Sequence, residues 1–158
     1  MTVTFAMLIS SCNKEGAKPE IDIHELGFEN SKTAVIGEEL HMDAEIVADN
    51  KIDRIEIEIH PEGVHEKSTG GVNSSVEWEF DTAYTKFSGL RNTLFHEHIE
   101  IPGDADPGNY HFHLTVTDME GYQTVFEDEL ELLVAAGSKG YQTIHEDELE
   151  LLVASGSK

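Results

Sequence analysis

Histidine is the residue type in this chain with the clearest potential for chemistry. The 158 residues include nine histidines, and four of them form two His-x-His pairs, His96/His98 and His111/His113. Residues two apart on a β-strand point to the same face of the strand. Each pair would therefore present two imidazoles side by side. Imidazole nitrogens are ligands for Zn²⁺, Cu²⁺ and Ni²⁺, so the pairs indicate a candidate transition-metal site.

Both pairs lie on segments with the period-two alternation of a half-buried strand. In residues 93–101 and 109–118, apolar side chains occupy the positions opposite to the histidines. Residues 52–60 alternate in the same way, with three isoleucines on one face and His60 on the other. This alternation predicts strands with one face in a core and one face in water. The histidines are expected to point away from the core.

The rest of the chain continues this pattern. Alternating segments also occupy residues 20–26, 38–48, 76–80 and the stretch after Tyr122, and turn-forming residues separate them. Short strands with a turn every ten residues or so are typical of a β-sandwich. We predict an all-β fold, an immunoglobulin-like antiparallel β-sandwich of about seven strands, with a duplicated C-terminal strand. The division would be 1–19 as a leader-like segment and tether, 20–139 as the sandwich, and 140–158 as the duplicate.

One stretch resembles a known class of domain. The run ADPGNYHFHLTVTDMEG resembles the penultimate strand of bacterial immunoglobulin-like domains, with Tyr110 at the tyrosine-corner position. From about Cys12 to Leu133 the chain resembles an uncharacterised family of Bacteroidota lipoproteins, including its segments FHEHIEIP and YHFHLTVTD. The resemblance implies a single immunoglobulin-like domain and a surface location, and it implies no activity.

The topology of such a sandwich suggests how the histidines could meet. The start of the strand 109–118 would lie beside the end of the strand 52–60, and the following loop carries His65. The candidate metal ligands are His60, His65, His96, His98, His111 and His113. One difficulty is specific: the strand 93–101 normally belongs to the opposite sheet, which would hold its histidines on the wrong face.

Two alternatives to a transition-metal site stay open. Histidines on an exposed strand face can simply be solvated polar residues. Oxygen ligands for Ca²⁺ are available in predicted turns, although without the spacing of an EF-hand; these are Asp104, Asp106, Asp118 and Glu120. For the transition-metal site, Zn or Cu is the expected cofactor.

The single cysteine suggests a location. Residues 3–11 form a short apolar run, too short to span a bilayer, that ends just before Cys12. The tetrad 9–12 resembles a bacterial lipobox, in which the cysteine is lipidated, although the preceding residues lack the Lys or Arg of an ordinary signal peptide. We expect an extracytoplasmic protein at the outer membrane or cell surface, with Cys12 as the lipidation site and no other membrane contact.

Net charge limits the partners. The chain has 32 acidic against 10 basic residues, a formal charge of −22, so nucleic acid and anionic membrane surfaces would be repelled. The same negative charge attracts cations. Sequence motifs of common hydrolases, nucleotide-binding loops and zinc proteases do not occur. We therefore expect a protein that is not an enzyme.

The C-terminus contains an internal repeat. Residues 121–139 recur as 140–158 with three differences, Val125/Ile144, Phe126/His145 and Ala136/Ser155. The first copy should complete the sandwich, although its Glu- and Leu-rich composition also permits a helix. The second copy could pair with a sheet edge of the same or another molecule. The favoured function is a non-enzymatic binding or adhesion module at the cell surface, with a histidine-bound metal. The alternative is a subunit of a filament or oligomer, joined by strand addition through the second copy.

Overall fold

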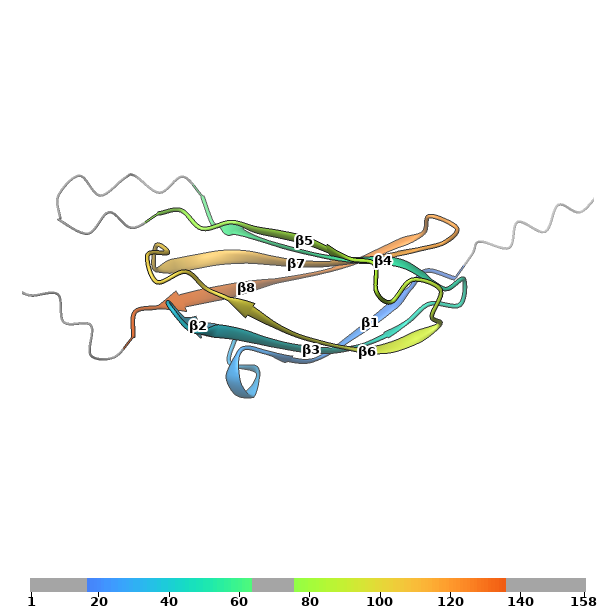
Figure 1. Cartoon of the computed structure of the whole chain (residues 1–158), viewed down its shortest axis with the longest axis horizontal. Coiled ribbons are helices and arrows are strands. Elements are labelled where there is room, and N and C mark those ends of the chain that lie inside the picture. Colours follow the sequence, from blue (N-terminus) through green and yellow to red (C-terminus); the bar gives the residue numbers. More distant parts are fainter. Residues whose placement is uncertain (1–16, 64–75, 136–158) are drawn as a thin grey trace, which may run out of the picture.

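The alternating segments of the sequence form eight β-strands in the computed structural model, which describes residues 17–63 and 76–135 (Figure 1). A one-turn 3₁₀ helix, η1 (Phe28–Asn30), follows the first strand. The strands are β1 (Glu20–Leu26), β2 (Thr33–Val35), β3 (Glu39–Val47), β4 (Ile52–Pro61), β5 (Phe80–Tyr84), β6 (Asn92–Glu100), β7 (Gly108–Asp118) and β8 (Gln123–Leu133).

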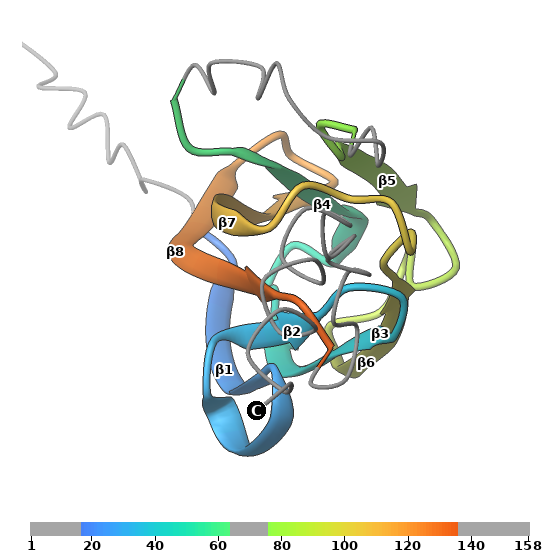
Figure 2. The ribbon, with the colours of Figure 1, turned by 90° about the vertical axis from the view of Figure 1, so that its left-hand side faces the viewer.

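The strands form two sheets that pack face to face. One sheet has the order β1-β3-β6 and the other the order β2-β8-β7-β4-β5. The view along the long axis shows the two layers (Figure 2). All pairs are antiparallel except β2 with β8. The predicted all-β, immunoglobulin-like sandwich is confirmed, with β4, β7 and β8 adjacent as in that fold.

The structure has one strand more than the predicted seven, because the N-terminal part of the chain contributes β1 to one sheet and β2 to the other. Gly27 takes a positive φ of 72°, and the turn after it carries the chain from β1 in one sheet to β2 in the other. A Cβ on Gly27 would lie 2.4 Å from the carbonyl oxygen of Thr33, so glycine is required there. The sequence analysis did not identify β2, which has only three residues.

The fifth strand lies later in the sequence than predicted. Residues 76–80 were expected to form it, but β5 runs from Phe80 to Tyr84, and Val76 makes only an isolated bridge to Ala105. Inward-facing Phe80 and Tyr84 pair with Ile59 and Ile55 of β4, and this cross-strand packing places the strand.

The two inner faces form one hydrophobic core. Its largest fully buried side chains include Tyr110, Phe95 and Phe112, and isoleucines of β4 lie between them. Within the first copy of the repeat, residues 123–133 form β8 and bury Leu130 and Leu132, so this part is a strand and not a helix. Residues 140–158, Cys12 and His65 lie outside the described residues. None of the described residues belongs to a helix long and apolar enough to cross a membrane.

The predicted tyrosine corner is present at the start of β7. The hydroxyl of Tyr110 donates a hydrogen bond of 2.8 Å to the carbonyl oxygen of Asp106, and its ring packs against Trp78. Tyr110 is 1% exposed. Burial raises the pKa of Tyr110 above its usual value, and the negative charges of Asp106 and Glu77 act in the same direction. The corner fixes the entry of β7 into its sheet.

We expect Tyr110→Phe to lower the free energy of unfolding by about 1–2 kcal/mol, because the Asp106 carbonyl loses its partner. The raised pKa means that the folded chain holds this proton more tightly than the unfolded chain. This stabilisation is present below pH 10 and is lost as the pH rises through the folded pKa. Urea denaturation between pH 7 and 11 should therefore show a steeper alkaline loss for the wild type than for Tyr110→Phe. Equal slopes would contradict it.

Candidate metal centre

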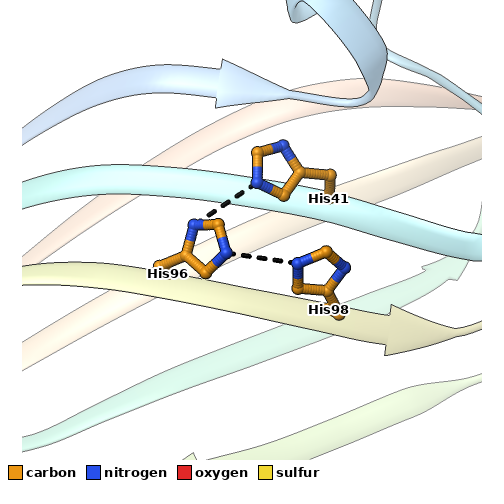
Figure 3. A group of neighbouring side chains, drawn as sticks. All are labelled: His41, His96 and His98. Atoms are coloured by element: carbon orange, nitrogen blue, oxygen red, sulfur yellow. Dashed lines mark hydrogen bonds between the residues drawn. The ribbon is translucent and has the colours of Figure 1, made fainter.

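Three histidines gather on the outer face of the three-stranded sheet: His41 from β3, and His96 and His98 from β6 (Figure 3). The antiparallel register places His41 directly opposite His98 and Asp43 directly opposite His96. Because side chains alternate along a strand and Leu40, Met42 and Phe95 are on the inner face, the three histidines are on the outer face.

The separations of the three rings suit one metal ion. One potential ligand atom from each ring can be chosen so that all lie within 4.8 Å of one another. Nε2 of His41 is 3.3 Å from Nδ1 of His96, and the Nε2 atoms of His96 and His98 are 3.1 Å apart. Ring centroids are 4.7, 5.0 and 5.0 Å apart. Three imidazoles bound at about 2.0–2.1 Å to a tetrahedral Zn²⁺ would have centroids about 5 Å apart.

A carboxylate lies beside the Nδ1 atom of each ring. Nδ1 of His41 is 3.2 Å from Glu25, Nδ1 of His98 is 3.0 Å from Glu39, and Nδ1 of His96 is 3.4 Å from Asp43. An Nδ1–H that donates to a carboxylate leaves the Nε2 lone pair free for a metal, and such partners orient ligands in many metal sites. For His96 to bind the same ion through Nε2, its ring must turn slightly, because its Nδ1 now faces His41.

The site is open to solvent on one side. The side chain of His41 is 28% exposed, and those of His96 and His98 are 52% and 49% exposed. A metal held by three nitrogen ligands would have a fourth coordination position available to water or to a ligand atom from another molecule. The surrounding carboxylates also favour a cation electrostatically.

Five of the six sequence-predicted ligands lie among the described residues, and they are divided between two faces. His96 and His98 lie on β6 in the three-stranded sheet, whereas His60, His111 and His113 lie on the outer face of the five-stranded sheet. The core separates the two outer faces, so the predicted gathering of these residues at one pole is wrong. The two groups are separated because residues 93–101 belong to the opposite sheet, which is the difficulty that the sequence analysis noted. His65 lies outside the described residues.

His41 was missed by the sequence analysis, although a signal for it existed. Its segment, residues 38–48, shows clear alternation, which places His41 on the outer face. The second and fifth strands of an immunoglobulin sandwich are neighbours in one sheet. That pairing, once applied to this strand and to residues 93–101, brings His41 beside His98.

Asp118, one of the four residues of the calcium alternative, has a structural role. The Asp118 side chain accepts hydrogen bonds from Asn50 Nδ2 at 2.9 Å and from the backbone N–H groups of Glu120 and Tyr122 at 3.0 and 2.8 Å. Asp118 is 1% exposed. Its carboxylate therefore holds the β7–β8 turn together.

The fold and the outward histidines define an immunoglobulin-like β-sandwich with a candidate metal centre on one sheet. Residues 9–133 match the family described as Domain of unknown function (DUF4625), and the chain belongs to this family. This agrees with the expectation of an uncharacterised family. A search of curated proteins found no match.

Solved structures similar to the chain include two of OgpA from Akkermansia muciniphila and the GspB Siglec domain. Wild-type OgpA has a TM-score of 0.48 and 8% identity over 73% of this chain and 29% of its own. Catalytically inactive OgpA in complex with an O-glycopeptide substrate has a TM-score of 0.44 and 12% identity, again over 73% of this chain and 29% of its own. The GspB Siglec domain has a TM-score of 0.44 and 18% identity, over 75% of this chain and 57% of its own. This chain thus spans less than two thirds of each.

Proposed function

We propose that the protein is a non-enzymatic binding module that holds one transition-metal ion through His41, His96 and His98. The observation that carries this proposal is the set of three imidazoles with potential ligand atoms within 4.8 Å, each with its Nδ1 beside a different carboxylate. Nitrogen ligands favour Zn²⁺, Cu²⁺ or Ni²⁺ over Ca²⁺ or Mg²⁺. Zn²⁺ and Cu²⁺ are the expected ions.

Binding without catalysis is the better reading of the geometry. Three histidines and an open fourth position also occur in catalytic zinc sites. Those sites add a dry, shaped cavity around the reacting water. Here two of the three rings are about half exposed on the face of a sheet. One depression on the same sheet is lined by Glu20, Ile21, Asp22, Glu45 and Val47, and none of the three histidines lines it.

The proposal places the module at the bacterial surface, as a lipoprotein anchored through Cys12. It is supported by the short apolar run of residues 3–11 and by the likeness of the tetrad 9–12 to a lipobox. A source among the Bacteroidota is part of this proposal. A surface-exposed metal with an open coordination position suits adhesion or capture of an external ligand.

Lipidation gives a direct prediction. When the wild-type chain is expressed in a bacterium that is supplied with an alkyne-labelled fatty acid, the chain should acquire the label and fractionate with membranes. Cys12→Ser should lose both properties, because the thiol is the acylation site. Ser11→Ala, one residue earlier, is the matched control and should remain labelled. An unlabelled wild type would contradict the anchor.

Assembly by strand addition has less support from the described strands. Glu97 points inward from the edge strand β6 and pairs with Lys86, and β1 carries a bulge between Ile23 and Glu25. Inward charges and bulges protect edge strands from pairing with other chains. The short β2 and β5 form the edges of the other sheet. The alternative therefore depends on residues 140–158, outside the described part.

The test of the metal proposal is a calorimetric titration of untagged protein with ZnCl₂. We expect the chain to bind one tight equivalent of Zn²⁺. Failure to bind Zn²⁺ or Cu²⁺ would contradict the proposal.

A further inference from the structure

We propose a second, weaker transition-metal site on the opposite face of the sandwich, formed by His60, His111 and His113. It goes beyond the function proposed above, because it uses different residues on the other sheet and would exist even if the first site did not. Its ligand is the same chemical class, a divalent ion that prefers imidazole nitrogen.

The register of β4 and β7 brings these three histidines together. His60 pairs directly with His111, and Glu58 pairs directly with His113. The partners of both histidines on the other side, in β8, are Glu129 and Glu127. Inward-facing Ile59 and Phe112 are fully buried, so alternation leaves the three rings on the outer face.

Two of the three ring separations are already close to those expected around a shared ion. The centroid of the His60 ring lies 5.2 Å from that of His111 and 5.3 Å from that of His113. Both values match the separation of about 5 Å expected for imidazoles on one tetrahedral Zn²⁺. The His111 and His113 centroids are 6.3 Å apart, so these two rings must approach each other by rotation about their side-chain bonds.

The neighbours of the rings indicate a weaker site than the first. Nδ1 of His60 lies 3.4 Å from the carbonyl oxygen of Pro61, and an Nδ1–H donated to that oxygen would leave the Nε2 lone pair free for a metal. His111 and His113 have no carboxylate hydrogen bond among the described residues, whereas each ring of the first site has a carboxylate beside Nδ1. Loss of such orienting partners typically lowers metal affinity about 10–100-fold. Glu58 or Glu127, one on each side of His113, could supply a fourth, oxygen ligand.

The experiment is a Zn²⁺ titration of the untagged full-length chain by calorimetry, with three variants. The wild type should bind two equivalents, the second about 10–100-fold more weakly than the first. His60→Ala with His111→Ala should lose the weak equivalent and keep the tight one. His41→Ala with His98→Ala should lose the tight equivalent and keep the weak one, which separates this proposal from the first. His65→Ala, which changes a histidine four residues after the end of β4 in the sequence, should keep both equivalents.

Three results would overturn the proposal. One is a wild type that takes up a single equivalent. Another is a His60→Ala, His111→Ala protein that still takes up two. The third is a weak equivalent that disappears with His65→Ala. Circular dichroism checks that each variant folds, and ring resonances of histidine-labelled wild type give a measurement without mutation. The signals of His60, His111 and His113 should shift between the first and second equivalents; constant signals would refute the site.

Discussion

Zn²⁺ binding at the first site should fall at least about 100-fold when His41 and His98 are both replaced by alanine. The two residues are direct cross-strand partners and supply two of the three nitrogens. A single remaining imidazole cannot hold the ion at this affinity, because loss of even an orienting neighbour costs about 10–100-fold. The measurement is competition with a chromophoric zinc chelator. The substitutions remove partly exposed side chains, so the fold should persist.

His24→Ala is the matched control for this double variant. His24 lies on β1 of the same sheet, near Asp43, with its Nδ1 3.4 Å from Oδ1 of that residue, but it is outside the group of three. Its removal should leave the tight equivalent in place. Undiminished Zn²⁺ affinity in His41→Ala, His98→Ala would show that the metal binds elsewhere and would end the proposed function.

The second large effect is on stability, from Phe95→Ala. Phe95 is fully buried and makes edge-to-face contacts with Tyr84 and Phe87, at centroid distances of 5.1 and 5.5 Å. Truncation of a buried phenylalanine typically costs about 3–5 kcal/mol, because the lost transfer free energy is joined by the cost of a cavity. We expect a loss of this size in guanidinium denaturation. A loss below about 1 kcal/mol would mean that the β5–β6 end of the core is not packed as described.

Leu94→Ala provides the comparison within the same strand. Leu94 precedes Phe95, points to the outer face and is 68% exposed. Its truncation should change the free energy of unfolding by less than about 0.5 kcal/mol. The contrast between adjacent positions tests the strand parity on which the metal site depends. If the parity were reversed, His96 and His98 would face the core.

Much of the fold was predictable because alternation reports directly on burial. The isoleucines of residues 52–60 and the aromatic residues of 109–118 predicted the inner faces that the structure shows. Tyr110 predicted its corner, which depends on a local bond to Asp106 four residues away. The short β2 and the position of β5 were not predictable in this way, because each depends on pairing with a distant strand, β8 or β4.

By itself, the sequence determined most of the strands and which of their histidines point outward, since a period of two fixes the face of every side chain in a strand. Only the tertiary structure decided which outward histidines share a face. That grouping depends on sheet membership and on register, and both are set by long-range strand pairing. A one-residue slip in register would move the side chains of a strand to its other face. His96 and His98 thus meet His41, 55 and 57 residues earlier in the chain, rather than His111 and His113.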